Sequence, residues 1–363
     1  MSEFGINVFD FGAKGDGVTD DTAAIQSAID FTAKRGGGRI LFPYTNKGYR
    51  IASAGIEEYN GMPVRSQLVI PSGTINIELV GEMPCRLLNS YQVRPLESAK
   101  NNYVPTQFRT PICNNTRLFS DWEAPEEHDP TARPWSILAA PQGKSLKGHF
   151  SVSKVTITNL EFAVYLNTDK MYPTESAVNL QNVSRAQVRD SQFCLNQQVG
   201  DTVLGKELLH NPCHTVGLMM SGDQNDHNVL ENVAVQGFRY GFVLGENVVG
   251  NYLYVHNCEE AITFHDSSHL SVINRIHAQH NTVIISTTRE KLFGHEKGPC
   301  FVEIGNINME NGDNLMPRIN ALKVAVLDED DRLVGSVKWH QPWGNKRFPV
   351  VGATRFKVTE FGT

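Results

Sequence analysis

The sequence predicts an all-β solenoid in which short strands stack in successive coils, because strand-like runs recur along the chain. One set of such hydrophobic runs starts at Ala177, Val216, Phe242, Ile262, Ile284 and Phe301. Their spacing suits coils of roughly twenty residues or more, apart from one longer interval between the first two runs. A second set of runs lies between them, and no long helical pattern separates the runs. We therefore expect one continuous elongated domain.

Composition and charge exclude several classes of protein. The chain has 363 residues, of which 40% are hydrophobic, and it contains no apolar run of the roughly 18 residues that cross a bilayer. Its formal net charge is −6 without any block of basic residues, which leaves no electrostatic footprint for nucleic acid. The six cysteines form no CxxC pair, so a cysteine zinc site is not expected. These values fit a globular protein without a membrane or nucleic-acid partner.

The amino-terminal segment predicts a short helix flanked by strands. Residues 7–17 run from alternating apolar residues into a glycine-rich turn, and the Thr19-Asp20-Asp21 run supplies capping side chains for a helix. The apolar positions Ile25, Ala28 and Ile29 follow helical spacing, and three glycines at 36–38 end the helix before strands at 39–43 and 49–51. The turn matches neither GxGxxG nor a Walker loop, so nucleotide binding is not expected.

This segment closely resembles the start of the pectate-lyase-like superfamily of right-handed parallel β-helices. The resemblance covers about 45 residues, NVFDFGAKGDGVTDDTAAIQSAIDFTAKRGGGRILFPYTNKGYRI, which form the amino-terminal cap in that family. It implies an all-β right-handed parallel β-helix with an N-terminal capping helix and large loop insertions. It leaves the chemistry open, because the family includes glycoside hydrolases, polysaccharide lyases, epimerases and phage tailspikes.

The expected organisation is a β-helix domain over residues 1–320 followed by a β-hairpin cap over 321–363. Residues 1–52 form the N-terminal cap, and the irregular stretches 83–150 and 197–215 are expected to be loop insertions. Such excursions commonly form walls of a binding groove on this architecture. The tail is predicted as a hairpin because apolar runs at 323–327 and 333–339 flank an acidic turn.

Three acids are expected to stack on one face of the coils. Aligning the runs at Phe242 and Ile262 places Glu246 and Asp266 one coil apart, and Asp223 falls nearby in the preceding coil. Repulsion between close carboxylates raises the pKa of at least one, which gives a glycosidase its acid beside its base or nucleophile. The neighbouring His265 and His227 are candidates for orienting or proton-transfer groups. This pattern predicts a glycoside hydrolase that cleaves a polysaccharide or oligosaccharide. Solvated turn residues are the alternative interpretation.

The residues expected to bind substrate are charged, aromatic or imidazole groups of the same coils: Asp226, Arg239, Tyr240, Tyr252, His256 and Arg275. No metal site is expected, because the i, i+4 histidine pairs do not share a face on strands. Bases are scarce in these coils, which disfavours a lyase. A polysaccharide lyase or uronate epimerase of the same fold nevertheless remains the first alternative, with Ca²⁺ as its cofactor if the chain is a lyase. A non-catalytic glycan-binding tailspike or adhesin module is the second alternative.

The expected partner is a polysaccharide or oligosaccharide, and the expected assembly is a monomer or a homotrimer. The first five residues lack the features of a secretion signal. We expect a secreted, periplasmic or cell-surface protein whose signal is absent from this sequence, or a component of a phage particle.

Overall fold

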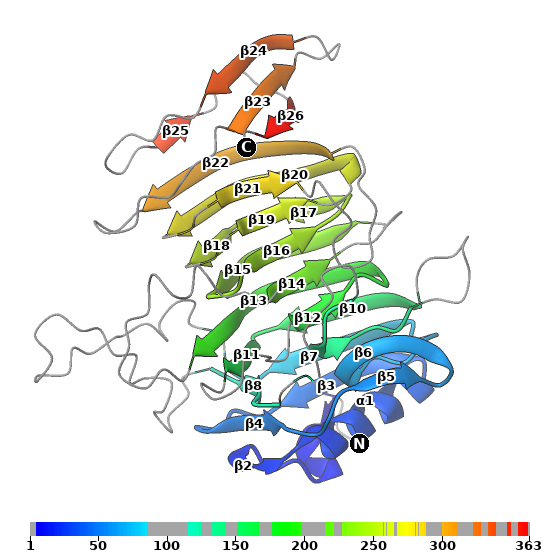
Figure 1. Cartoon of the computed structure of the whole chain (residues 1–363). Coiled ribbons are helices and arrows are strands. Elements are labelled where there is room, and N and C mark those ends of the chain that lie inside the picture. The colour runs from blue at the N-terminus through cyan, green and yellow to red at the C-terminus, as the bar shows by residue number, and fades with distance from the viewer. Residues whose placement is uncertain are drawn as a thin grey trace, which may run out of the picture.

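The computed structural model shows a stack of parallel coils with the two termini at opposite ends (Figure 1). The structure describes residues 5–83, 85, 115–122, 124, 133–142, 151–166, 176–197, 215–220, 227–256, 258, 260–264, 267–279, 281, 283–287, 300–310, 322–327, 333–338, 347–349 and 355–361. None of the helices within these ranges is long and apolar enough to span a membrane.

One side of the stack is sheet B, an eight-stranded sheet whose members pair parallel except at its first edge. Equivalent residues of successive coils pair in a regular register. For example, Leu218 pairs with Phe242, and Phe242 pairs with Ile262. The strands are β5 (Ile56–Tyr59), β6 (Met62–Val69), β9 (Ser136–Ala139), β12 (Ser176–Leu180), β14 (Val216–Met220), β16 (Tyr240–Leu244), β19 (Glu260–Phe264) and β21 (Val283–Thr287).

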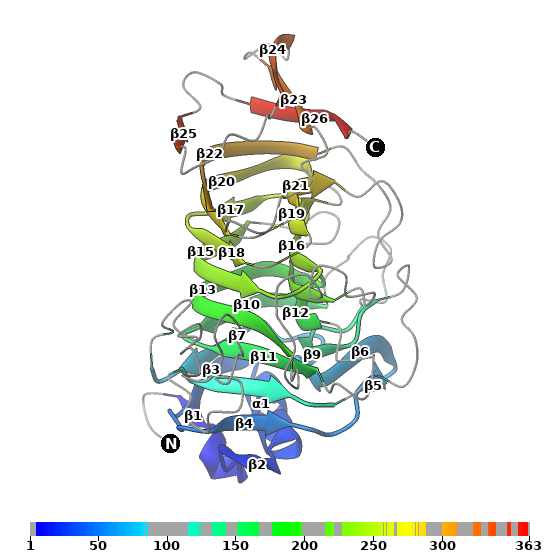
Figure 2. The same cartoon turned by 60° about the vertical axis from the view of Figure 1, so that its left-hand side comes forward.

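Sheet A supplies the other two sides of each coil, as two runs of strands that meet at a corner. Figure 2 shows sheet B and the first run of sheet A on different sides of the stack. The first run contains β1 (Ile6–Asn7), β3 (Gly37–Phe42), β7 (Asn76–Gly81), β10 (Val152–Thr158) and β17 (Val248–Gly250). The second run contains β2 (Asp16–Asp20), β4 (Gly48–Ile51), β8 (Arg117–Ser120), β11 (Glu161–Leu166) and β18 (Leu253–His256). Strands β13 (Val183–Gln197), β15 (Asn228–Gln236), β20 (Ser267–Gln279) and β22 (Cys300–Glu310) extend through both.

The corner between the two runs is built by asparagine and aspartate. Asn159, Asp190 and Asn232 have φ of 57°, 45° and 55°, a left-handed conformation that Asn and Asp tolerate better than most residues. Their side chains also link coils, since Asn232 Nδ2 donates to Asp190 Oδ1 at 2.6 Å. Further along the stack, Asn274 Nδ2 donates to Asn251 Oδ1 at 2.8 Å. Asp190 and Asn232 thus turn the chain and bridge coils at the same time.

The interior of the coils is filled by stacked hydrophobic side chains. Phe162 and Phe193 occupy the same register position on neighbouring coils, with ring centroids 5.8 Å apart and planes only 14° apart. Val235 and Val255 stack in the same way in the following coils. Because successive strand residues point to opposite faces, the residues between these positions point outward. The predicted right-handed parallel β-helix is confirmed.

Two segments bear on the predicted organisation. Strands β8 and β9 lie within the predicted insertion 83–150, so part of that segment belongs to the coils. The second predicted insertion lies outside the described residues except for Gln197 in β13 and Thr215. The carboxyl-terminal strands pair antiparallel, β23 (Leu322–Leu327) with β24 (Leu333–Lys338) and β26 (Arg355–Phe361), while β25 (Arg347–Pro349) pairs with β22.

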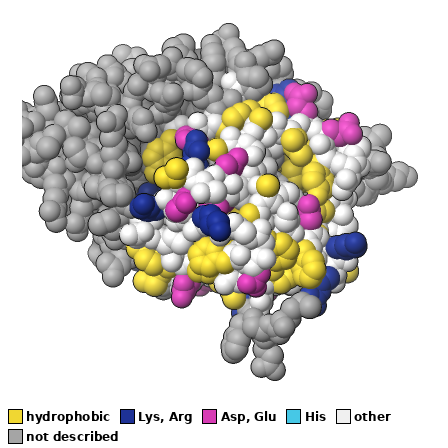
Figure 3. Space-filling view, turned by 90° about the horizontal axis from the view of Figure 1, so that it is seen from below, with side chains coloured by type: hydrophobic (Ala, Val, Ile, Leu, Met, Phe, Trp, Pro, Cys, Tyr) yellow, Lys and Arg dark blue, Asp and Glu magenta, His cyan; other side chains and the backbone are white. Residues whose placement is uncertain are grey.

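The amino-terminal cap contains η1 (Val8–Phe11) and α1 (Thr22–Lys34), which covers the open end of the core with Ile25, Ala28 and Ile29. Seen from this end, charged side chains of both signs lie among hydrophobic ones (Figure 3). Asp21 precedes the helix, but its carboxylate accepts hydrogen bonds from the backbone N–H groups of Lys14 (2.7 Å) and Gly15 (3.0 Å) instead of capping the helix. Within the predicted capping run, Asp21 therefore makes no side-chain cap, whereas Asp20 accepts a hydrogen bond from the Thr22 N–H, the first of the helix, at 3.1 Å.

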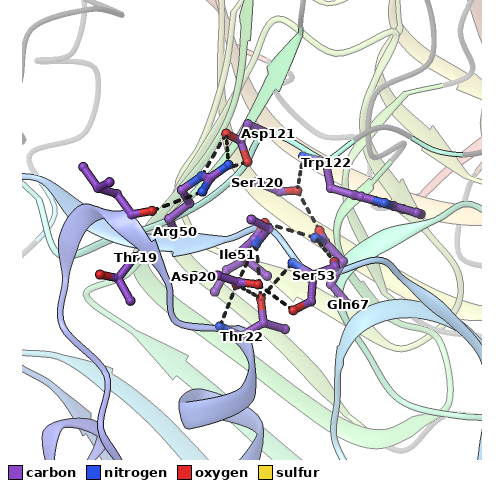
Figure 4. A network of polar contacts seen from close by, with 12 residues as sticks. Thr19, Asp20, Thr22, Arg50, Ile51, Ser53, Gln67, Ser120, Asp121 and Trp122 are labelled. Carbon is purple, nitrogen blue, oxygen red and sulfur yellow. Dashed lines mark hydrogen bonds and ion pairs between the residues drawn. The ribbon is translucent and has the colours of Figure 1, made fainter.

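Asp20 connects the helix to the next strand. Its carboxylate accepts from the Thr22 hydroxyl, the Ala52 N–H at 3.0 Å and the Ser53 hydroxyl at 2.6 Å (Figure 4). Burial acts to raise the pKa of Asp20, but hydrogen bonds from Ser53, Thr22 and Ala52 outweigh it and lower the pKa to about 2. The acids of the cap motif are thus structural groups and not a catalytic set.

We predict that Asp20→Asn destabilises the protein at neutral pH and that the effect disappears in acid. The folded pKa lies below the ordinary value of 3.8, so the carboxylate stabilises the fold above about pH 4 and loses this contribution as the pH falls through about 2. Thermal unfolding of both proteins between pH 7 and pH 2 measures the difference. A difference in melting temperature that stays constant over this range would contradict the prediction.

We also predict that Gly37→Ala is far more destabilising than Gly73→Ala. Both glycines have positive φ, but a methyl group at 37 would overlap the carbonyl oxygen of Asn76, whereas nothing lies within 4 Å of one at 73. The expected loss of unfolding free energy is about 1–2 kcal/mol for Gly73→Ala and about 3 kcal/mol or more for Gly37→Ala. Urea denaturation measures both, and equal losses would contradict the steric argument.

Candidate functional site

The outward face of the second run of sheet A carries buried polar side chains. Glu161, Gln192, Gln236 and His256 alternate with core residues along their strands and are each at most 7% exposed. Polar groups are rarely buried on the outer face of a strand without a structural or functional reason. Register places these residues in two adjacent rows that run along the stack.

One end of this face holds a group of aromatic, imidazole and guanidinium side chains, which we call the Tyr–His cluster: Tyr252, Tyr254, His256, Arg275 and His277. Tyr254 and His256 are on β18, and His277 pairs with Tyr254 from β20. The Tyr252 and Tyr254 hydroxyls are 2.5 Å apart, and the ring centroids of Tyr254 and His277 are 4.9 Å apart. The imidazoles of His256 and His277 lie nearly parallel with centroids 6.0 Å apart.

Arg275 adds a positive charge to this cluster. Its Cζ lies 5.1 Å from the centroid of the Tyr252 ring, a cation–π contact, and its side chain is exposed. The cluster therefore combines hydroxyl and imidazole groups that can transfer protons with a guanidinium that can pair with an anion. All members except His256 remain at least partly accessible to a ligand.

Further along the same face lies a buried ion pair. Arg117 Nη2 is 2.6 Å from Glu161 Oε1, and Asn115 Nδ2 donates to Glu161 Oε2 at 2.6 Å. Arg117 Nη1 also donates to the Tyr165 hydroxyl at 3.3 Å. Since the Glu161 side chain is fully buried and both of its oxygens accept hydrogen bonds, this pair holds the face together.

Three of the predicted substrate-binding residues lie together in the Tyr–His cluster: Tyr252, His256 and Arg275. Tyr254 and His277 belong with them but were not among the predicted site residues. A signal for both exists in the sequence. Residues 252, 254 and 256 alternate along one stretch, and His277 follows Tyr254 at a separation close to one coil.

Arg239 and Tyr240 lie elsewhere, at the start of β16 in sheet B. Arg239 Cζ is 5.5 Å from the Tyr240 ring centroid, and Tyr240 packs in a hydrophobic cluster with Val216, Met219 and Val243. Packing accounts for Tyr240, and the structure does not bring this pair to the Tyr–His cluster.

Glu246 is the only predicted catalytic acid within the described residues. It follows β16 at the turn from sheet B to the first run, is 1% exposed, and its Oε2 lies 2.6 Å from Nδ1 of the exposed His269. Phe242 pairs with Ile262, as the alignment of these two strands predicts. His227 is exposed just before β15. The remaining predicted residues lie outside the described part of the chain: Asp223, Asp226, His265 and Asp266.

The preceding coil aligns differently from the prediction. Leu218 pairs with Phe242 and Met220 with Leu244, a separation of 24 residues, whereas the starts of the predicted runs at Val216 and Phe242 are 26 residues apart. Within the described residues, no group of three or more His, Cys, Asp or Glu side chains could hold a metal ion.

Comparison with known proteins supports the family resemblance of the cap. The family model described as "Rhamnogalacturonase A/epimerase, pectate lyase-like" matches residues 5–62, from β1 into β6. The recognition of a pectate-lyase-like β-helix from the amino-terminal motif is confirmed.

Curated relatives come from Azotobacter vinelandii. Alginate lyase 7 is 49% identical over 75 residues, which is 21% of this chain and 8% of that protein. Mannuronan C5-epimerase AlgE4 is 53% identical over 49 residues, 14% of this chain and 8% of that protein. The chain thus spans less than a tenth of the length of these relatives.

One similar solved structure is the A-module of mannuronan C5-epimerase AlgE4 from the same organism. It is 13% identical to this chain, and the match covers 86% of this chain and 98% of that chain with a TM-score of 0.25. Another is Pantoea stewartii WceF, a glycan biofilm modifying enzyme with a bacteriophage tailspike-like parallel β-helix fold. It is 13% identical, and the match covers 88% of this chain and 46% of that chain with a TM-score of 0.30. At these scores the fold assignment rests on the strand register described above.

We predict that the Arg117–Glu161 pair is structural and that its two residues are energetically coupled. Glu161→Gln should lower the unfolding free energy by about 3–5 kcal/mol, because it removes the carboxylate charge that pairs with the largely buried Arg117 guanidinium. The exposed pair Arg189–Glu231, 3.3 Å apart, is the matched control, and Glu231→Gln should cost less than about 1 kcal/mol.

Urea denaturation of Glu161→Gln, Arg117→Met and the double variant measures the coupling. The double variant should lose less free energy than the two single variants together. Simple additivity would show that the pair does not act as a unit.

Proposed function

We propose that this protein is a carbohydrate-active β-helix enzyme that acts on an acidic polysaccharide by removing the C5 proton of a uronate residue. The observation that carries this proposal is the Tyr–His cluster, in which hydroxyl, imidazole and guanidinium groups adjoin on one face. The names of the curated relatives, an alginate lyase and mannuronan C5-epimerases, agree with this chemistry. The proposal follows the lyase or epimerase alternative and not the predicted hydrolase.

The C5 proton of a uronate is weakly acidic, because its removal places negative charge next to a carboxylate. A cation paired with that carboxylate stabilises the developing charge, and Arg275 is the exposed guanidinium of the cluster. A base must then accept the proton. His277, His256 and the Tyr254 hydroxyl are the candidate bases, and their rings adjoin within the cluster.

Two outcomes follow from the same first step. In elimination, the C5–H electron pair forms a C4–C5 double bond, the C4–O4 bond breaks, and O4 takes a proton from an acid such as a tyrosine hydroxyl. In epimerisation, C5 is reprotonated from the opposite face and no chain bond breaks. The Tyr252 and Tyr254 hydroxyls, 2.5 Å apart, provide a relay for a proton in either case.

Glycoside hydrolysis is the second candidate, and the confirmed pairing of β16 with β19 favours it. The expected stacking of acids rests on this alignment, and Asp266 itself lies outside the described residues. The fit of Glu246 to that role is weaker, because its carboxylate is buried against His269. Hydrolysis adds water across the bond, whereas elimination does not, so product mass separates the two.

The location and assembly stay as predicted from the sequence. A glycan substrate of this type places the protein outside the cytoplasm or on a phage particle, and a monomer and a homotrimer both remain to be tested. The proposed chemistry uses residues of the chain alone. If the reaction is elimination, Ca²⁺ is the cofactor to test by chelation.

We predict that the protein converts alginate or polygalacturonate without hydrolysis. Elimination will produce an unsaturated sugar that absorbs in the ultraviolet, and epimerisation in D₂O will place deuterium at C5 without shortening the chain. Tyr254→Phe should lower kcat by about 10²-fold or more, as expected for loss of a proton-transfer group.

Tyr59→Phe is the matched control, since the Tyr59 hydroxyl donates to Asp30 in the amino-terminal cap, away from the cluster. It should retain full activity. Products with added water, or full activity of Tyr254→Phe, would overturn the proposal. Glycan binding without any turnover would instead favour the binding-module alternative.

A further inference from the structure

Arg133, which lies just before β9, has no carboxylate partner among the described residues. The side-chain hydrogen bond that it makes there is a long one, 3.4 Å from Nη2 to Asn182 Oδ1. Burial lowers the pKa of Arg133 to about 10. Arg133 is half-buried, and a partly desolvated cation without a carboxylate partner is a candidate for binding an anionic ligand.

The turn around Asn182 contains further polar groups that lack partners within the described part of the chain. Gln181, directly before it, is 2% exposed, and neither its amide nitrogen nor its amide oxygen has a hydrogen-bond partner there. The backbone N–H of Ser151 donates to the Asn182 carbonyl at 3.0 Å, and the Ser151 hydroxyl is also buried without a partner. Buried polar groups are almost always satisfied, so this concentration around Asn182, whose side chain contacts the Arg133 guanidinium, points to a binding site.

A second arginine and two tryptophans adjoin Arg133. Arg65 Nη1 donates to the Arg133 carbonyl oxygen at 3.4 Å, and the Arg65 guanidinium lies over the Trp135 ring, 5.6 Å from its centroid. Arg65 approaches Glu57 no closer than 3.9 Å. Trp135 in turn meets the partly exposed Trp122 edge to face, with centroids 5.3 Å apart. Arginines beside aromatic rings suit a ligand that has both a negative charge and an apolar ring face.

We propose that Arg133 anchors a second glycan-binding site, on the sheet B side of the coils, that takes the carboxylate of an acidic sugar. The planar guanidinium can bind a carboxylate through two parallel hydrogen bonds. The site is separate from the Tyr–His cluster, which lies on the second run of sheet A. That the carboxylate belongs to a glycan rests on the proposed function, whereas the anion site itself rests on Arg133 and its neighbours.

The test is a direct binding measurement in the Tyr254→Phe background, where turnover is suppressed. Tetramannuronate is titrated while tryptophan fluorescence is recorded, and the signal from this site is the part that Trp135→Phe removes. Arg133→Met should weaken this binding at least tenfold, and Arg39→Gln, an exposed arginine paired with Glu78, should leave it unchanged. Cellotetraose, which is neutral, should not bind at this site.

A second readout separates binding from a structural role. Without ligand, Arg133→Met should melt at the same temperature as the parent or higher, because it removes a half-buried charge that has no carboxylate partner among the described residues. Unchanged tetramannuronate affinity in Arg133→Met would overturn the proposal, as would a lower melting temperature with unchanged binding. Sulfate binding without tetramannuronate binding would also overturn it, since the site would then hold only a small anion. Binding is measured without turnover. The titration therefore tests the anion site even if the proposed chemistry is wrong.

Discussion

The parallel hydrogen-bonded register between coils is the constraint on which the rest of the structure depends. Each strand pairs with the equivalent strand one coil away, so equivalent residues become neighbours about 4.8 Å apart. The interior stack of Phe162 on Phe193 and the corner contact of Asn232 with Asp190 are both consequences of this pairing. The candidate site has the same origin, because Tyr254 and His277 are separated by a whole coil in sequence and are adjacent in space.

A stack of this kind needs closed ends, and the amino-terminal cap provides one. Helix α1 covers the hydrophobic interior, while Asp20 and Asp21 tie it to the adjoining loop and strand through backbone hydrogen bonds. The closeness of the family match over residues 5–62 therefore reflects a structural demand. In the sequence alone, a motif with three aspartates resembles a catalytic motif. In the structure its carboxylates accept hydrogen bonds from the surrounding cap.

The sequence was sufficient to predict the fold and to name part of the candidate site. Recurrent apolar runs and the cap motif identify the β-helix, and the pairing of β16 with β19 follows from aligning two strands of equal pattern. Tyr252, His256 and Arg275, which lie together in the Tyr–His cluster, were selected by residue type. Tyr254 and His277 were missed because coil length varies along the stack. The step from β16 to β19 is shorter than the step from β14 to β16, so counting alone does not fix the partner of a given residue. The environment of the Arg133 guanidinium could not be predicted from the sequence either, because it depends on which side chains the fold brings near it.

The alternation of faces along β20 has a consequence for how such a protein can change during evolution. Ile276 points into the core and His277 points outward, so one residue gained or lost within the strand would exchange them and place an imidazole among Phe and Val side chains. A residue gained in a turn between strands bulges outward and leaves the pairing intact. Loops on this scaffold can therefore diversify in length, and with them the choice of glycan, while the spacing inside β18 and β20 must stay as it is.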